Sequence, residues 1–103
     1  MAACSVVWSD QAYVSLLQAC TFIADDSLEG AKTVVRELVK HAQTLENLPR
    51  RNPIEPALTS ASVEYRFLAK WNFKIIYTIL EDDKIVLMVL VFGTRQNPSQ
   101  LKI

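Results

Sequence analysis

The sequence predicts an α+β fold whose elements follow the order strand, helix, helix, strand, strand, strand. Apolar residues recur at intervals of three and four between residues 10 and 45, which is typical of helices that bury one side. Residues 64–98 instead read as three consecutive antiparallel strands joined by tight turns. The chain has 103 residues, half of them apolar, which suits a single core. We therefore expect one domain that spans residues 1–103.

The first strand and the first helix are predicted from a short apolar run and a helix cap. Residues 4–8, CSVVW, are apolar enough for a strand. Ser9 and Asp10 follow, with side chains that suit a helix N-terminus. The helix is expected to end near Ala24. Its apolar side is formed by Ala12, Tyr13, Leu16, Leu17, Cys20 and Ile23.

A second helix is predicted to begin after Ser27 and to continue to about Leu45. Ser27 can cap its N-terminus, and Glu29 lies in the first turn, where the helix dipole favours a carboxylate. Because only a short turn separates the two helices, we expect an amphipathic helical hairpin. The apolar face of the second helix is formed by Ala31, Val34, Val35, Leu38, Ala42 and Leu45.

The second half of the chain is predicted to be a connection followed by a strand meander. Residues 47–61 contain three of the four prolines and no consistent period, so they are expected to be irregular. The last strand is apolar at every position after Lys84, which indicates a central place in the sheet beside the N-terminal strand. The three strands are expected over residues 63–70, 73–80 and 84–92.

The charge of the chain is balanced overall but uneven along its length. Eleven Lys and Arg residues are matched by eleven Asp and Glu residues. Residues 1–46 carry three basic and six acidic groups, whereas residues 47–103 carry eight and five. Domains that bind nucleic acid through its phosphates usually have a basic excess. The balance therefore disfavours a general nucleic-acid surface and leaves direct binding at a local site open.

The cysteines and the lone histidine give no metal or cofactor signal. Cys4 and Cys20 lie at apolar positions, so we expect buried free thiols. Their spacing with His41 fits no zinc pattern, and no cofactor is indicated. The N-terminus lacks the basic start and apolar run of a signal peptide, and no membrane partner is indicated. We therefore expect a reducing, cytoplasmic location.

Four segments of the chain match a known family in their order and spacing. They are VVWSDQA near the start, YRFL, FKIIYTIL and VLVFGTRQNP, which with the predicted hairpin span residues 6–98. This pattern resembles the RelE/ParE superfamily, the toxins of bacterial type II toxin–antitoxin and plasmid-stabilisation systems. The resemblance implies a small twisted antiparallel sheet with the two-helix hairpin packed on one face. It also implies a cognate antitoxin protein that holds the toxin inactive.

One mechanism in this superfamily is RNA cleavage. Members that resemble RelE cleave messenger RNA on the ribosome, using cations that stabilise the phosphate transition state. Ser62 and Glu64 stand where cleaving members carry lysines, and Leu101 stands where they carry a tyrosine. The groups for proton transfer are therefore missing, and a glutamate in such a site would repel phosphate. The catalytic residues that this resemblance implies are Arg66, Lys74 and Arg95.

The other mechanism is growth inhibition by binding. Members that resemble ParE share the fold, lack that catalytic set and bind DNA gyrase. The missing tyrosine, the neutral total charge and the chain length favour this mechanism, and a ribosome-dependent mRNA endoribonuclease is the alternative. Whether the chain is an enzyme thus stays open. An inactive relative that only binds an antitoxin and an unrelated small interaction domain are further alternatives.

The antitoxin is expected to cover part of the helical hairpin. Antitoxins of this superfamily wrap the toxin with a disordered or helical segment, which by the resemblance would cover apolar grooves here. A small core cannot absorb every apolar position of two helices. The candidate antitoxin-binding residues are Val14, Val35 and Val39.

The remaining aromatic residues and the histidine have structural interpretations. Trp8 and Trp71 are expected to pack rather than to stack on bases. Tyr77 is expected to be a core aromatic residue with its hydroxyl group satisfied. His41 is expected to lie at the surface.

Overall fold

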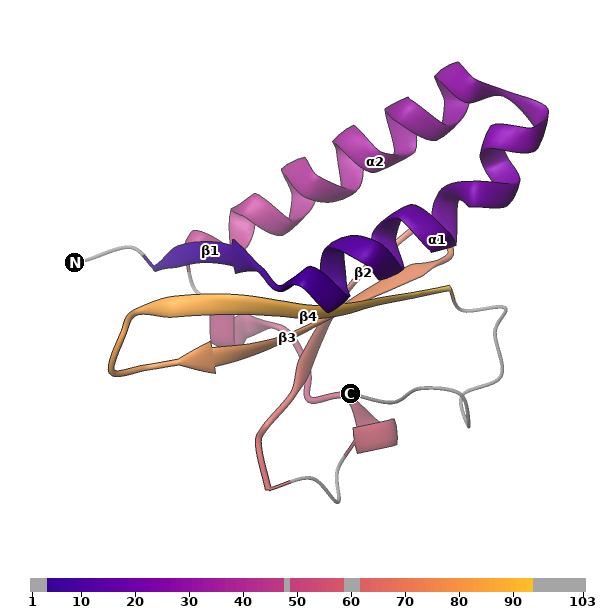
Figure 1. Cartoon of the computed structure of the whole chain (residues 1–103). Helices are drawn as coiled ribbons and strands as arrows, with labels where there is room; N and C mark the ends of the chain where they lie inside the picture. The colour runs from indigo at the N-terminus through magenta and orange to yellow at the C-terminus, as the bar shows by residue number, and fades with distance from the viewer. Residues whose placement is uncertain (1–3, 48, 59–61, 94–103) are drawn as a thin grey trace.

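The structure is a computed structural model that describes residues 4–47, 49–58 and 62–93. Within these residues, a two-helix hairpin lies over one face of a four-stranded sheet (Figure 1). The order of helices and strands follows the prediction, and the irregular connection contains short 3-10 turns. The elements are β1 (Ser5–Trp8), α1 (Asp10–Asp26), α2 (Leu28–Gln43), η1 (Thr44–Glu46), η2 (Pro49–Arg51), η3 (Pro56–Leu58), β2 (Arg66–Lys70), β3 (Phe73–Leu80) and β4 (Ile85–Gly93).

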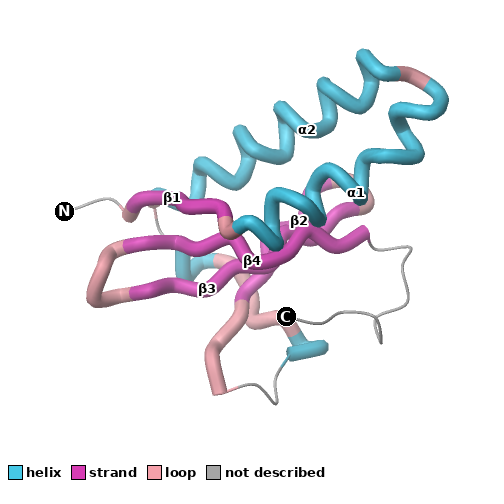
Figure 2. Tube along the Cα trace, in the orientation of Figure 1, coloured by secondary structure: helices cyan, strands magenta, loops and turns pink. Residues whose placement is uncertain are grey.

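The strand order across the sheet is β1-β4-β3-β2, which places β4 between β1 and β3 as its apolar sequence predicts (Figure 2). The strands β2, β3 and β4 form the expected antiparallel meander, in which Arg66 lies opposite Tyr77. The first strand runs parallel to β4, with Ser5 opposite Ile85. The sheet is therefore mixed, whereas the resemblance implied antiparallel pairing. The long helical crossover that separates β1 from the meander permits this parallel neighbour.

The main core lies between the helical hairpin and the sheet. A hydrogen bond fixes α1 to β4, because Ser15 Oγ accepts the backbone N–H of Val91 at 2.8 Å. The same hydroxyl donates to the carbonyl oxygen of Ala12 at 2.8 Å, so it both donates and accepts a hydrogen bond. The buried residues of this core are Ala12, Leu16, Cys20, Leu38, Ala42, Leu45, Leu68, Phe73, Ile75, Tyr77, Val86, Met88 and Val91.

A smaller apolar cluster fills the opposite face of the sheet. Ile76, Val89 and Phe92 are buried there, and Tyr65 and Phe67 pack against them. Because β4 contributes side chains to both clusters, its uninterrupted apolar sequence is explained by burial on both faces.

Local capping and turn geometry set the starts of the helices and of β4. The Oγ atom of Ser9 accepts the N–H of Ala12 at 3.0 Å, and that of Ser27 accepts the N–H of Gly30 at 2.9 Å. Both caps agree with the sequence prediction. Lys84 has a φ of 54°, which belongs to the left-handed region and to a turn. This is why β4 begins one residue later than expected.

Candidate functional site

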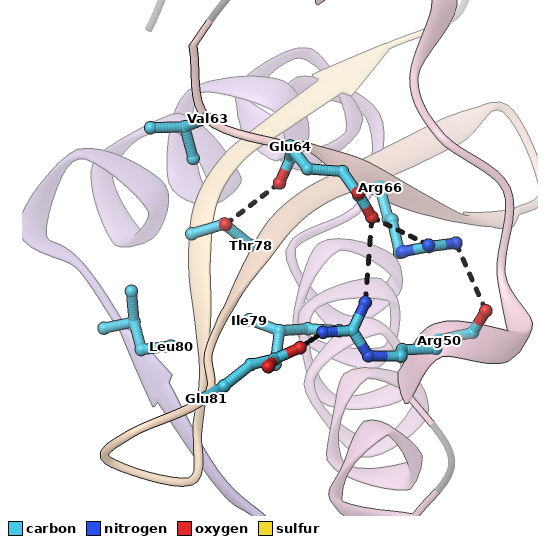
Figure 3. A pocket seen from close by; sticks show the side chains of 8 residues that line it. All are labelled: Arg50, Val63, Glu64, Arg66, Thr78, Ile79, Leu80 and Glu81. Atoms are coloured by element: carbon cyan, nitrogen blue, oxygen red, sulfur yellow. Dashed lines mark hydrogen bonds and ion pairs between the residues drawn. The ribbon is translucent and has the colours of Figure 1, made fainter.

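Arg66, the first residue of β2, is built into the edge of the sheet (Figure 3). Its Nη1 atom donates to the carbonyl oxygens of Arg50 at 3.2 Å and of Asn52 at 2.6 Å. Its Nη2 atom lies 2.7 Å from Glu64 Oε1. The Nε atom is buried without a hydrogen-bond partner among the described residues. The guanidinium group therefore fastens the connection to the sheet and is neutralised by a carboxylate.

A hollow of about 190 Å³ lies beside this guanidinium group (Figure 3). Arg50 reaches across it to Glu81, with which it forms an ion pair, and lies 3.9 Å from Glu64. The hollow thus holds two arginines and two glutamates, so its formal charge is zero. It offers no excess of positive charge to an anionic substrate. The hollow is lined by Arg50, Val63, Glu64, Arg66, Thr78, Ile79, Leu80 and Glu81.

Lys74 of β3 forms a separate ion pair on the other face of the sheet. Its Nζ atom lies 3.1 Å from Glu55 Oε1 and 4.3 Å from the centroid of the Phe67 ring. The side chain of Glu55 is only 2% exposed, and that of Lys74 is 28% exposed. Lys74 therefore compensates a buried carboxylate, which is costly to leave unpaired.

The register of β2 and β3 shows that Arg66 and Lys74 leave opposite faces of the sheet. Arg66 lies opposite Tyr77, whose side chain belongs to the main core under the helices. Lys74 lies opposite Ala69, and its strand neighbour two positions on, Ile76, belongs to the cluster on the other face. Directly opposite residues share a face, and successive residues alternate. The two predicted catalytic cations are thus not brought together, and Arg95 lies outside the described residues.

The connection before β2 contributes more to this region than its irregular sequence suggests. Ile54 forms an isolated antiparallel bridge with Arg66. The N–H of Phe67 donates to the carbonyl oxygen of Pro53 at 3.1 Å. The connection therefore covers the first half of the outer edge of β2. Sequence reasoning missed Arg50 and Glu55, which pair with Glu81 and Lys74, because this connection has no periodic pattern that indicates such contacts.

Tyr77 has the structural role that the sequence predicted. Its side chain is fully buried, and its hydroxyl donates to the carbonyl oxygen of Pro49. Burial raises the pKa of the Tyr77 hydroxyl, and the nearby charges of Arg66 and Arg51 offset this only in part. The hydroxyl therefore stays protonated at neutral pH, and its proton is directed to the carbonyl oxygen of Pro49.

The three antitoxin-binding candidates differ in their exposure. Val14 on α1 is 50% exposed and Val39 on α2 is 37% exposed. Val35 is partly buried and packs against the main core. Tyr13 and Leu17 on α1 are also exposed, at 55% and 46%. The hairpin thus presents apolar side chains that the core does not absorb.

The two tryptophans differ from each other. Trp8 is partly buried against the main core, which confirms its expected packing. The expectation that Trp71 packs is wrong, because Trp71 is 57% exposed. It lies in the β2–β3 turn with a φ of 54°, and Lys70 Nζ sits 4.7 Å from its ring centroid. A tight turn points its residues outward, which the sequence interpretation did not consider.

His41 is partly buried rather than fully at the surface. Burial, and secondly the positive charge of Lys70, lower the pKa of His41. The imidazole is therefore neutral at pH 7. Lys70 is the last residue of β2, and α2 contacts this strand.

Among the residues that the structure describes, the thiols and carboxylates form no metal centre. Cys20 is a buried free thiol as expected, and burial raises its pKa, whereas Cys4 is half-buried and also free. In the described ranges no group of three His, Cys, Asp or Glu side chains is placed to hold a metal ion. Neither helix in the same ranges has the length and apolar character needed to cross a membrane.

Comparisons with known proteins identify the fold. No family model and no curated protein match the chain. Among solved structures, the chain is similar to one in the crystal structure of the toxin–antitoxin complex RelBE2 from Mycobacterium tuberculosis. The TM-score is 0.62 at 17% identity, and the alignment covers 90% of this chain and 93% of that chain. At this identity the likeness shows the fold alone: the chain has a RelE-like α+β fold.

Proposed function

We propose that this chain is the toxin of a type II toxin–antitoxin pair of the plasmid-stabilisation kind. Its fold is that of a chain in a toxin–antitoxin complex, and its motif order resembles the RelE/ParE superfamily. In this proposal, residues 1–103 act as one domain in the bacterial cytoplasm and arrest growth until a cognate antitoxin binds. The mode of action is ParE-like, so the chain inhibits an essential target such as DNA gyrase by binding it.

One observation favours inhibition by binding over inhibition by RNA cleavage: Arg66 and Lys74 lie on opposite faces of the sheet. Cleavage requires cations that converge on one phosphate as charge develops. These side chains leave opposite faces of the sheet. Arg66 is paired with Glu64 at 2.7 Å and Lys74 with Glu55 at 3.1 Å. Turning both cations toward a common phosphate would break both pairs and take the lysine charge away from the buried carboxylate of Glu55.

The antitoxin surface in this proposal lies on the helical hairpin. More than a third of the surface of Val14 and of Val39 is exposed to solvent, so a partner can cover these residues without disturbing the core. Val35 contributes the part of its side chain that the main core leaves accessible. An amphipathic segment of the antitoxin that packs on these side chains would remove them from water.

A ribosome-dependent mRNA endoribonuclease is the second candidate, because the solved complex with this fold is named RelBE2. Under this candidate the ribosome is the target, and Arg66, Lys74 and Arg95 are catalytic. It requires that Arg66 leave Glu64 in order to meet a phosphate. The third candidate is an inactive relative that only binds the antitoxin.

The experiment that separates these candidates is expression of the chain in bacteria with and without its neighbouring small gene. We expect growth arrest by the chain alone and recovery when the antitoxin is made. Purified chain should then produce gyrase-dependent DNA breaks and leave messenger RNA on translating ribosomes intact. Ribosome-dependent RNA cleavage would establish the second candidate, and unaffected growth would establish the third.

A further inference from the structure

The hollow beside Arg66 carries equal numbers of positive and negative side chains. Arg50 and Arg66 are its cations, and Glu64 and Glu81 are its anions. Because each arginine is paired with a glutamate, an anionic ligand that took an arginine would deprive a glutamate of that partner. A cationic ligand would deprive an arginine of its glutamate in the same way. A ligand that carries one charge of each sign replaces both partners at once.

The two ion pairs of the hollow differ in how firmly they are held. The side chain of Arg66 is only 16% exposed, and its Nη2 atom lies 2.7 Å from Glu64 Oε1. The side chains of Arg50 and Glu81 are 54% and 62% exposed. Ion pairs as exposed as this one contribute little to stability, so Arg50 and Glu81 can separate at small cost. A ligand can therefore enter between these two residues while Arg66 and Glu64 stay paired.

An apolar wall completes the lining of the hollow. Val63 is 44% exposed and Leu80 is 37% exposed, and Ile79 is partly buried against the main core. Figure 3 shows Val63 and Leu80 on one side of the hollow and the two arginines on the other. Ligand sites combine such an apolar wall with a few polar groups that fix the orientation of the ligand. An apolar group on the ligand would thus remove Val63 and Leu80 from water.

The size of the hollow favours a small molecule. Its volume of about 190 Å³ is below the range of roughly 300–1,000 Å³ that sites for drug-sized ligands occupy. Free apolar amino acids are small molecules that carry a carboxylate, an ammonium group and an apolar side chain. Within a protein segment the same main-chain groups are joined in peptide bonds, so they carry no charge. The hollow therefore matches a free amino acid better than a segment of a partner protein.

We propose that the hollow lined by Arg50, Val63, Leu80 and Glu81 binds a free apolar α-amino acid as its zwitterion. The carboxylate of the ligand accepts hydrogen bonds from the guanidinium group of Arg50, and its ammonium group donates to the carboxylate of Glu81. The apolar side chain of the ligand packs on Val63 and Leu80. One exposed ion pair is replaced by two, and the net charge of the hollow stays at zero. This site does not depend on whether the chain is a toxin.

The test titrates the full chain with leucine at neutral pH and follows its backbone amide signals by nuclear magnetic resonance. We expect saturable shifts at Val63, Ile79 and Leu80, with a dissociation constant of roughly 1 mM because the partners of the ligand are half exposed. Three compounds each lack one feature of leucine: isocaproate has no ammonium group, leucinamide no carboxylate and glycine no apolar side chain. Each should bind at least about tenfold more weakly than leucine.

Variants assign the binding to the hollow. Arg50→Gln and Glu81→Gln each remove one partner of the ligand from an exposed ion pair, so both should keep the fold. The carbonyl oxygen of residue 50, which Arg66 binds, is retained. Each variant should weaken leucine binding about tenfold or more. Glu29→Gln is the matched control, because Glu29 forms an exposed ion pair with Lys32 on α2, and it should bind leucine as the unaltered chain does.

Four results would overturn the proposal. The first is equal binding of isocaproate or leucinamide, which would show that only one charge of the ligand is recognised. The second is equal binding of glycine, which would exclude a contribution of the apolar wall. The third is unweakened binding of leucine by both Arg50→Gln and Glu81→Gln. The last is the absence of any saturable shift at leucine concentrations well above the expected dissociation constant.

Discussion

Ser15 and Val91 are joined across the main core by a hydrogen bond of 2.8 Å, from the backbone N–H of Val91 to Ser15 Oγ. The two residues lie 76 positions apart, on the first helix and on the last strand. Val91 is 4% exposed, so water cannot replace the serine hydroxyl. This bond joins α1 to β4 and, together with the packing of the main core, positions the hairpin on the sheet.

Replacing Ser15 by alanine is therefore expected to destabilise the fold. The Val91 N–H would be left buried without a partner, which lowers the free energy of unfolding by about 1–3 kcal/mol. Urea denaturation measures this difference. Thr33→Ala is the matched control, because the hydroxyl of Thr33 also bonds to a helix carbonyl, Glu29 O at 3.0 Å, but in an exposed position. Equal effects of the two variants would show that the bond to Val91 is unimportant.

The ion pair between Lys74 and Glu55 is expected to respond unequally to loss of either partner. Lys74→Met removes the cation that faces the buried carboxylate of Glu55, which should cost roughly 3 kcal/mol. Glu55→Gln leaves Lys74, which is 28% exposed and can turn toward water, so its cost should be about half as large. The double variant should be less destabilised than Lys74→Met alone. Thermal denaturation of the three variants tests this order, and a larger loss for Glu55→Gln would contradict it.

The lone histidine is expected to make stability depend on pH below neutrality. The pKa of His41 is lowered in the folded chain by burial and by Lys70, so the unfolded chain binds the proton more readily. Stability is therefore fully present above about pH 6.5 and is lost as the pH falls through the lowered value. The titration of the imidazole signal should show a midpoint below 6.5 that rises in Lys70→Gln. A midpoint unchanged by this substitution would exclude the lysine charge as a cause.

The helical hairpin, the meander and the central place of β4 could be predicted because each depends on local periodicity. Ser27 marked the start of the second helix, whose apolar residues fall on one side. The residues after Lys84 are all apolar, which predicted a strand buried on both faces. The sequence also allows the prediction that Arg66 and Lys74 lie on opposite faces of the sheet. A two-residue turn at Trp71-Asn72 pairs Ala69 with Lys74 and Arg66 with Tyr77, which puts the cations on opposite faces.

The remaining features depend on contacts between distant segments, which periodicity does not encode. The parallel direction of β1 relative to β4 depends on where the helical hairpin and the connection bring the chain back to the sheet. The partners of Arg66, the carbonyl groups of Arg50 and Asn52, come from a connection without regular structure. A carboxylate as buried as that of Glu55 is unusual, so its position among prolines gave no sign that Lys74 would be its partner.

The proposed antitoxin-binding surface on the helical hairpin can be tested by substitution. Val14→Asp and Val39→Asp should each weaken binding of the antitoxin by roughly thirtyfold, since a carboxylate buried in an apolar interface without a partner costs about 2 kcal/mol. Both positions are exposed in the free chain, so its stability should change little. Co-purification with a tagged antitoxin measures the loss. Val63→Asp is the control, because Val63 is 44% exposed but lies at the hollow beside Arg66. If the two hairpin variants retain the antitoxin as fully as Val63→Asp does, the antitoxin binds elsewhere on the chain.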